Sequence, residues 1–252
     1  MNNLPSIELV IIDWYPIITS ILKAGQGHVF IAGGYVYDCI RQAIGTGSYI
    51  EPNDVDFFFQ GFDHPSQATE CLDRIMKVIE AYVADPSHPY RIKLSRNKFV
   101  VEVDLQREAF IGDLGRACYK QKLQFILRLY DNESQCLSGF DLPAAQVGYS
   151  LEEGLFCTRA AAFTIVTTFQ HIDVGRRSSS MASRLKKYTT LKNVGIILPG
   201  LLSKDIENDD TESHETLDLI FRRNGNQHVH VHDHKFHLTT DSSDEENDDC
   251  DN

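Results

Sequence analysis

The chain has 252 residues, 42% of them hydrophobic, and a net charge of −12 at pH 7. This length accommodates one large domain or a domain with an appendage, and the hydrophobic content is that of a globular protein. No segment approaches the roughly 18 to 20 consecutive apolar residues of a transmembrane helix, and no basic segment leads into an apolar run at the N-terminus. We therefore expect neither a membrane span nor a secretory signal.

The charge is unevenly divided along the chain. Residues 1–203 contain 20 Lys/Arg and 21 Asp/Glu, whereas residues 204–252 contain 4 and 15. The acidity belongs to the C-terminal segment, so it is no argument against a polyanionic substrate for the rest. The six cysteines include no CxxC pair, which is typical of reduced, buried thiols and predicts an intracellular protein of the cytoplasm or nucleus.

The hydrophobic pattern predicts helices and strands in an order typical of an α+β or mixed α/β domain. In chain order, the first elements are a helix over residues 1–25 or two short helices broken at Pro16, a strand over 28–32, a helix over 35–44, a strand over 54–60 and a helix over 66–84. A hairpin of strands over 91–95 and 98–105, strands over 122–130 and 144–150, and helices over 155–170 and 181–188 follow.

The composition changes at about residue 203. Residues 1–203 are predicted to form the folded domain, and residues 204–240 a linker with a His-rich segment, in which 216–240 hold a short helix and a strand. Residues 241–252 are predicted to be a disordered acidic tail, because apart from Cys250 they contain no apolar side chains to offset the entropy of ordering.

Two carboxylates open the strand predicted over residues 54–60. Residues i and i+2 of a strand point to the same face, so Asp54 and Asp56 project together while Val55 points into the core. Paired carboxylates can hold the Mg²⁺ (or Mn²⁺) ions used in phosphoryl transfer from an NTP. Gly33 and Gly34 close the preceding strand and open a helix, where a phosphate can approach the backbone closely. The combination predicts a site for an NTP and a divalent metal.

The arrangement IAGGYVYDCIR followed by NDVDFFF resembles the head of the polymerase-β-like nucleotidyltransferase superfamily. Its GGxVxD form is most similar to tRNA CCA-adding enzymes and poly(A) polymerases, but CCA-adding enzymes have arginine at the place of Tyr37 and a shorter loop before the carboxylates. The downstream sequence is similar instead to uncharacterised nucleotidyltransferase-like proteins of large DNA viruses, phages and some eukaryotes. The resemblance covers about residues 28–200. It implies an α+β fold, a mixed sheet flanked by helices, for the nucleotidyltransferase-like domain over residues 1–203.

Sites of the polymerase-β type have a third acidic residue on a neighbouring strand, and two residues are candidates for it. Asp141, in SGFDL, matches the position where the resembling proteins keep GFD, although many of them have a second acid two residues later, at the place of Pro143. Asp104 alternates with Glu102 on its strand. We predict Asp54, Asp56 and Asp141 as catalytic residues and metal ligands, with Asp104 as the other metal candidate. The competing interpretation is that Asp141 caps a turn and that Glu102 and Asp104 form a solvated strand face.

A basic cluster lies within 17 residues that include no acidic residue: Arg176, Arg177, Arg184, Lys186, Lys187 and Lys192. Such a cluster can bind a triphosphate or a nucleic-acid backbone, so Gly33, Gly34, Arg184 and Lys187 are predicted to bind the nucleotide. The alternative is a solvated basic helix.

Two further groups of polar residues have competing interpretations. Asp38 and Arg41, one helical turn apart, either orient the nucleotide or, as the favoured interpretation, pair with each other at the surface. Residues 228, 230, 232 and 234 are histidines that alternate along a predicted strand, which indicates either an adventitious zinc or copper site or a polar edge strand.

The leading hypothesis is a nucleotidyltransferase that moves a nucleotidyl group from an NTP to an acceptor, with nucleic acid as one candidate partner. The alternative is a catalytically inactive nucleotidyltransferase fold that serves as a binding or regulatory module. A third hypothesis is a scaffold whose acidic tail recruits basic partners. The acceptor, the base preference and the oligomeric state stay open.

Overall fold

The computed structural model describes residues 17–46, 54–86, 90–110, 116–173, 175, 178, 180–197, 216–223 and 227–235. The expectations for residues 1–16 and for the acidic tail over 241–252 lie outside these ranges. Within the described ranges, no helix is both long and apolar enough to cross a bilayer.

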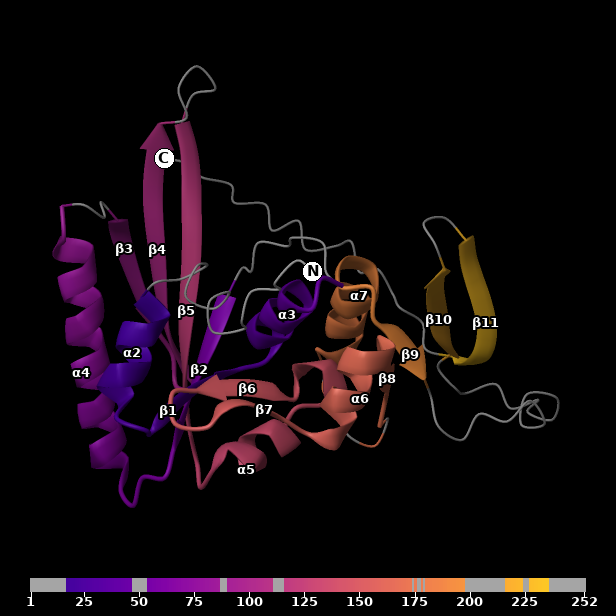
Figure 1. Ribbon diagram of the computed structural model, residues 1–252, viewed down its shortest axis with the longest axis horizontal. Helices are drawn as coiled ribbons and strands as arrows, with labels where there is room; N and C mark the ends of the chain where they lie inside the picture. Colours follow the sequence, from indigo (N-terminus) through magenta and orange to yellow (C-terminus); the bar gives the residue numbers. More distant parts are fainter. Residues whose placement is uncertain are drawn as a thin grey trace, which may run out of the picture.

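A seven-stranded mixed sheet forms the centre of the molecule, with strand order β3-β4-β5-β2-β1-β6-β7 (Figure 1). Its strands are β1 Val29–Ala32, β2 Asp54–Gln60, β3 Tyr90–Arg96, β4 Val100–Phe110, β5 Arg116–Tyr130, β6 Val147–Ser150 and β7 Gly154–Cys157. Neighbouring strands are antiparallel except β2 and β5, which are parallel. A parallel pair needs a long crossover connection, and here helix α4 (Pro65–Ala84) and the β3-β4 hairpin lie between the two strands in sequence.

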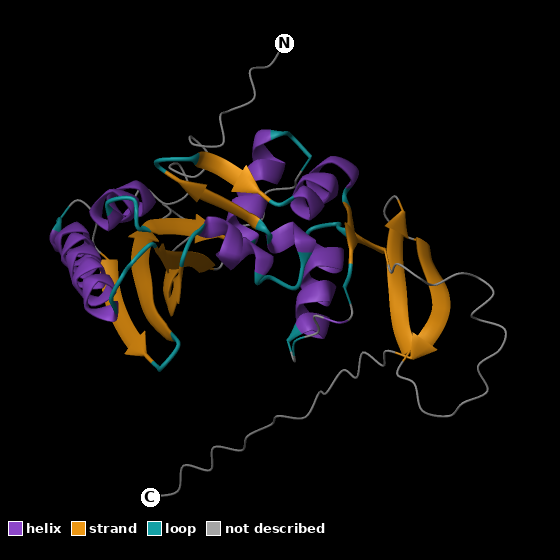
Figure 2. Cartoon of the chain, turned by 90° about the horizontal axis from the view of Figure 1, so that it is seen from below, coloured by secondary structure: helices purple, strands orange, loops and turns teal. Residues whose placement is uncertain are grey.

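Helices flank this sheet and small two-stranded sheets follow it. The helices are α2 Ile17–Gly25, α3 Gly34–Ala43, α4 Pro65–Ala84, α5 Glu133–Ser138, α6 Arg159–Thr167 and α7 Met181–Leu191, and a 3₁₀ turn, η2, spans Pro143–Ala145. Strand β8 Phe169–His171 pairs with β9 Gly195–Ile197, and β10 Thr216–Arg223 pairs with β11 Gln227–Lys235. Figure 2 shows the β10-β11 hairpin to one side of the helices and the main sheet.

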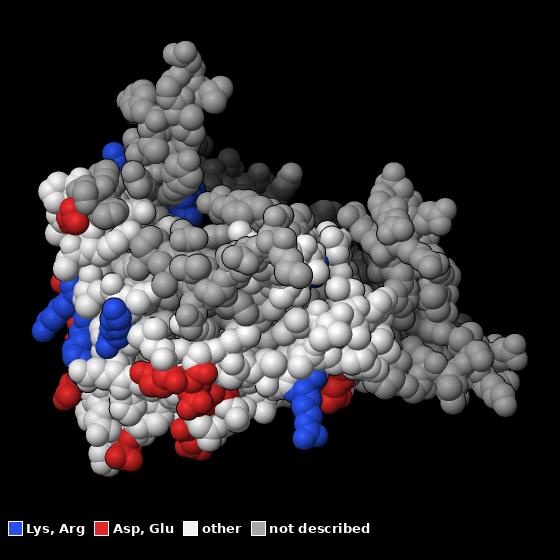
Figure 3. Space-filling model, viewed as in Figure 1, with Lys and Arg blue, Asp and Glu red and all other residues white. Residues whose placement is uncertain are grey.

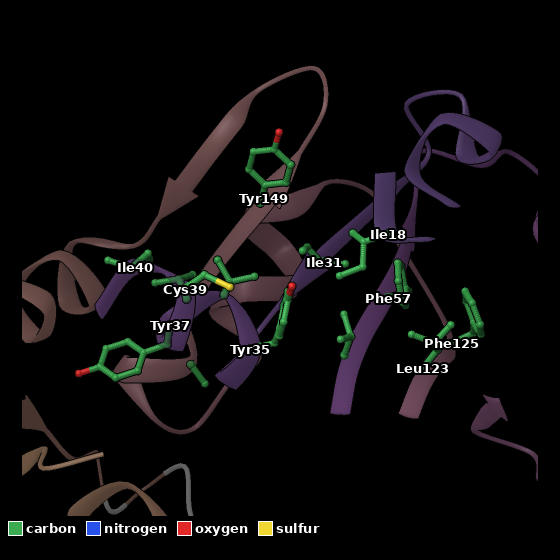
Figure 4. Packing of buried hydrophobic residues seen from close by; sticks show 14 of the residues in the cluster. Ile18, Ile31, Tyr35, Tyr37, Cys39, Ile40, Phe57, Leu123, Phe125 and Tyr149 are labelled. Atoms are coloured by element: carbon green, nitrogen blue, oxygen red, sulfur yellow. The ribbon is translucent and has the colours of Figure 1, made fainter. Parts of the chain in front are cut away.

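Strand β2 divides its side chains between two faces. Val55, Phe57 and Phe59 belong to the main core, which also includes apolar residues of α2, α3 and α4. The rings of Phe57 and Phe125 stack with centroids 4.9 Å apart, and Figure 4 shows both rings beside Ile18 of α2. On the other face, Phe58 packs in a smaller cluster with residues of β1 and α5. Because alternate residues share a face, Asp54 and Asp56 lie on the side of Phe58, outside the main core.

The structure confirms most of the elements expected in the first 150 residues. Strand β2 has the expected bounds, α3 lies one residue earlier than expected at both ends, α4 begins one residue earlier, and β3 and β4 form the expected hairpin. The expected α+β class, with a mixed sheet and flanking helices, is therefore observed.

Two expectations about elements were wrong. Residues 155–170 do not form one helix, because β7 occupies their start, the Thr158 side chain accepts a hydrogen bond from the Ala161 N–H and caps α6, and the left-handed Thr168 (φ 62) ends it before β8. Residues 216–235 hold two antiparallel strands, β10 and β11, in place of a short helix and a strand. The strand expected for the histidine positions is thus present as β11, and the side chains of that segment lie outside what the structure describes.

Candidate functional site

The glycine turn, formed by Gly33 and Gly34, connects β1 to α3. Gly33 has φ 92 and ψ −148, a left-handed conformation that favours glycine because it has no β-carbon. Its N–H donates to the Val147 carbonyl at 3.0 Å, and its carbonyl accepts from the Tyr37 N–H at 3.1 Å to begin the helix. A β-carbon at Gly33 would lie 3.7 Å from Oδ2 of Asp56. The turn thus places the N-terminus of α3 against a carboxylate of β2.

Asp54 and Asp56 are both half-buried on the same face of β2. The pKa of Asp56 is raised from 3.8 to about 7, first by burial and then by the negative charge of Asp54, while the positive charge of Lys187 opposes the shift. Two carboxylates are therefore held close together where water solvates them poorly. The expected pairing of these aspartates beside the glycine turn is what the structure shows.

Strands β5 and β4 continue the polar face of β2. Their register places Lys122 beside Asp54 and, one strand further, Asp104 beside Lys122. Adjacent strands are roughly 4.8 Å apart, so the Cα atoms of Asp54 and Asp104 are separated by about 10 Å. The Lys122 Nζ lies 4.0 Å from Oδ1 of Asp104. Asp104 thus has a lysine between itself and the aspartate pair.

The next row of this face contains amide and carboxylate side chains. Gln124 is beside Asp56 in the register, and Glu102 is beside Gln124. The Gln124 Nε2 donates to Oε1 of Glu102 at 2.6 Å. The strand position next to Asp56 is therefore an amide, which can offer an oxygen to a cation but no negative charge.

Asp141 follows α5 and is only 8% exposed. Its Oδ2 accepts hydrogen bonds from Ser178 Oγ at 2.8 Å and from an Arg184 Nη at 2.5 Å. The carboxyl thus forms an ion pair with Arg184 of α7. Neither of these two hydrogen bonds caps a turn. In the part of the chain that the structure describes, no three His, Cys, Asp or Glu side chains come together as metal ligands. The choice between Asp141 and Asp104 as a third carboxylate accordingly stays open.

Helix α7 and the residue that follows it carry the described part of the basic cluster. Its members differ in how far they are buried. Lys186 is exposed and Lys187 half-buried, whereas Lys192, directly after the helix, is buried. The Lys192 Nζ donates to Oδ2 of Asp38 at 2.7 Å and to the Gly34 carbonyl at 3.0 Å. Burial lowers the pKa of Lys192 and the charge of Asp38 opposes this. Lys192 therefore fastens the glycine turn to α7, and the interpretation of a solvated basic helix is wrong for this residue. Arg176 and Arg177 lie outside the described residues.

Asp38 and Arg41 do not pair with each other at the surface, which corrects the favoured interpretation. Asp38 pairs with Lys192. Arg41 is 7% exposed and donates to the Lys192 carbonyl at 2.9 Å and to Thr46 Oγ1 at 3.0 Å. Tyr37, at the position where CCA-adding enzymes have arginine, is fully buried, and its ring lies 5.9 Å from that of Tyr188. These side chains join α3 to α7 and so fix the helix that follows the glycine turn.

A cavity of about 210 Å³ is lined in part by Phe58, which lies on the same face of β2 as the aspartate pair. The side chains and backbone that line it are those of Phe58, Arg128, Tyr130, Cys136, Gly139, Phe140, Asp141, Ser178 and Arg184. Arg184 and Asp141 were expected at a site, whereas the aromatic lining was not. In the sequence, one feature indicated this aromatic lining: Phe58 lies two residues after Asp56 on the same strand face.

The outer surface gives little indication of a nucleic-acid interface on the side shown in Figure 3. Acidic side chains gather along the lower part of this view, and the basic side chains that are drawn form a small group at the left and otherwise stand singly. Among the described residues visible there, no continuous basic surface is present for a phosphate backbone.

Comparison with known proteins finds a family model and a viral relative that match the chain. Residues 9–168 match the model of a family described as "Gad2: Gabija anti-defense 2 family protein". The chain is 27% identical over 214 residues to "Uncharacterized protein R883" of Acanthamoeba polyphaga mimivirus, and the match covers 81% of this chain and 43% of that relative. The chain therefore spans less than half the length of the relative. The residues matched by the family include the glycine turn, the aspartate pair and Asp141, and they end before α7.

Proposed function

The chain belongs to the Gabija anti-defense 2 family, and we propose, from its own residues, that it transfers a nucleotidyl group from an NTP to an acceptor. Asp54 and Asp56 are the proposed ligands of Mg²⁺ or Mn²⁺. The observation that carries the proposal is the half-buried carboxylate pair beside the glycine turn, with the pKa of Asp56 raised to about 7. Two like charges that are held close together and poorly solvated destabilise the fold. Groups whose pKa is perturbed in this way concentrate at functional sites.

The oxygen donors of this site suit Mg²⁺. The ion is commonly bound through one or two protein carboxylates, with water and substrate phosphates as the remaining ligands. The aspartate pair meets that requirement, and the amide of Gln124 on the adjacent strand can add a neutral oxygen. When bound, Mg²⁺ neutralises charge on the phosphates and on the leaving pyrophosphate. Asp104 and Asp141 are candidates for a second ion.

In the proposed reaction, an oxygen of the acceptor attacks the α-phosphorus of the NTP. A new phosphorus–oxygen bond forms while the bond to the oxygen that bridges the α- and β-phosphorus breaks, pyrophosphate leaves, and the acceptor proton passes to water. The glycine turn lets the triphosphate approach the backbone at the positive end of α3. Lys187, whose charge already acts on Asp56, adds positive charge on the side of α7.

A catalytically inactive binding or regulatory module is the second candidate function. It is favoured by one observation, that Gln124 and not an acid lies beside Asp56 on β5. An amide cannot supply the charge of a third carboxylate. The anti-defense role in the family description fits both candidates, since either nucleotidyl transfer to a component of the Gabija defense or binding to it would interfere with that component.

Turnover of NTPs labelled at the α-phosphate separates the candidates. The full chain is incubated with each NTP and Mg²⁺, and pyrophosphate release and label transfer are measured for the wild type, Asp54→Asn, Asp56→Asn and, as a matched control, the exposed Asp63→Asn. The proposal expects turnover that Asp54→Asn and Asp56→Asn abolish and Asp63→Asn retains. Magnesium-dependent NTP binding without turnover would favour the inactive module. No NTP binding at all would leave only the scaffold.

A further inference from the structure

The cavity beside the aspartate pair, which we call the aromatic pocket, is placed to receive another part of the same nucleotide. Phe58 follows Asp56 by two residues on one face of β2, so their Cα atoms are about 7 Å apart. The space above Gly33 is bounded on one side by Oδ2 of Asp56 and on another by the ring of Phe140, at 3.7 and 3.8 Å from the position of a β-carbon. Phe140 of the pocket lining and Asp56 therefore lie on two sides of the same position at the glycine turn.

Two residues that line the pocket each have a buried polar atom without a hydrogen-bond partner. One is Oδ1 of Asp141, whose other oxygen is fully engaged, and the second is Nε of Arg184. An unsatisfied buried polar group is destabilising, and native proteins retain few of them. Because Arg184 is bonded to Asp141, this acceptor and this donor belong to one wall of the pocket. They match a ligand that presents a hydrogen-bond donor and an acceptor.

The other walls are aromatic. The ring of Phe58 meets that of Phe140 at 5.6 Å and 73°, and that of Tyr130 at 6.1 Å and 65°. The guanidinium of Arg128 lies 5.1 Å from the centre of the Tyr130 ring. Aromatic rings and guanidinium planes are the side chains on which proteins stack nucleobases. A cavity of about 210 Å³ is below the range typical of sites for whole drug-sized ligands, and it suits one planar ring system.

We propose that the aromatic pocket binds the base of the NTP, and this proposal rests on the proposed function. The rings of Phe58, Tyr130 and Phe140 form its apolar walls. Oδ1 of Asp141 accepts from an amino or ring N–H of the base, and Arg184 Nε donates to a neighbouring ring nitrogen or carbonyl oxygen. The triphosphate then extends toward the glycine turn and the aspartate pair. This arrangement assigns Asp141 to the recognition of the base.

Binding of NTPs and of inorganic triphosphate, both with Mg²⁺ and measured by calorimetry on the full chain, tests the proposal. Stacking of one base on aromatic side chains accounts for roughly ten-fold or more in affinity. Phe140→Ala is therefore expected to weaken NTP binding at least about ten-fold and to leave triphosphate binding unchanged. Arg128→Ala, at an exposed side chain, is expected to weaken NTP binding by a smaller factor with the same selectivity. Phe156→Ala is the matched control, because this ring lies on the same sheet face outside the pocket lining and contacts Phe30.

A positional measurement keeps the proposal testable if Phe140→Ala folds poorly. The fluorescence of 2-aminopurine riboside triphosphate is expected to be quenched on binding to the wild type and to the Phe156→Ala control, and less so on binding to Arg128→Ala. Equal loss of NTP and triphosphate binding in Phe140→Ala, or bound 2-aminopurine nucleotide that stays unquenched, would overturn the pocket assignment. Failure of the proposed function gives a different result in the wild type itself: NTP then binds with Mg²⁺ without pyrophosphate release, or neither NTP nor triphosphate binds in a manner that depends on Mg²⁺ and Asp56.

Discussion

The substitution Asp56→Asn should stabilise the fold at neutral pH while it removes a metal ligand. The pKa of Asp56 rises from an ordinary 3.8 to about 7 in the folded chain, mainly through burial and then through Asp54. Between pH 3.8 and about pH 7 the carboxyl of Asp56 is protonated in the folded state and ionised in the unfolded state. The free energy of unfolding of the wild type therefore falls as the pH rises from about 4 to about 7. Asparagine carries no charge and has no such loss.

The size of the effect follows from the shift of about three pKa units. At 1.36 kcal/mol per unit, the ionised carboxylate costs about 4 kcal/mol. Because the side chain is only half-buried and solvent screens part of the interaction, we expect a smaller gain, about 1–3 kcal/mol, for Asp56→Asn at pH 8 and almost none at pH 4.5. The free energy of unfolding by urea, measured at both pH values with chelator, gives this difference directly.

Addition of Mg²⁺ to the same unfolding measurements tests whether Asp56 binds a metal ion. A cation that binds the folded state stabilises it by mass action, so Mg²⁺ should raise the unfolding free energy of the wild type at pH 8 and leave that of Asp56→Asn unchanged. Asp63→Asn is the matched control, since Asp63 is exposed, and its substitution should give no gain. Asp56→Asn that is less stable than the wild type at pH 8 would refute the reasoning.

Four other variants test separate parts of the structure. Lys192→Met leaves Asp38 without its buried partner and should cost about 3–5 kcal/mol in urea unfolding, part of which the added Asp38→Asn recovers. Gly33→Ala forces a side chain into φ 92 and should cost roughly 1–3 kcal/mol by the same measurement. Phe57→Ala removes a fully buried ring and should cost about 3–5 kcal/mol, seen as a lower thermal midpoint. Arg184→Gln should weaken NTP binding in calorimetry; tighter Mg²⁺ binding instead would make Asp141 a metal ligand.

Local spacing in the sequence was sufficient for the parts of the site that lie close together along the chain. The alternation of DVDFFFQ places Asp54, Asp56 and Phe58 on one face and Phe57 on the other, as the structure has them. Gly33 and Gly34 end an apolar run, and the helix begins there as expected. These predictions succeed because strand alternation and glycine geometry depend on neighbouring residues alone.

Contacts between distant segments could not be predicted in this way. The partner of Asp38 is Lys192, 154 residues away. Helical spacing places Arg41 one turn from Asp38, and this spacing therefore favours the local pair. The parallel pairing of β2 with β5, with a register shift after Phe58, likewise depends on a crossover that no periodicity encodes. It determines that Lys122 and Gln124, and not an acid, lie beside the aspartate pair.

The ion pair of Asp141 with Arg184 bears on its two candidate roles. A guanidinium bonded to Oδ2 places a positive charge next to any cation at Oδ1, and at an effective dielectric constant of about 20 two unit charges 4 Å apart interact by about 4 kcal/mol. That repulsion opposes metal binding. The same guanidinium leaves Oδ1 as a good acceptor for a neutral N–H and fixes its direction. The free oxygen of Asp141 is thus better suited to a base than to a magnesium ion.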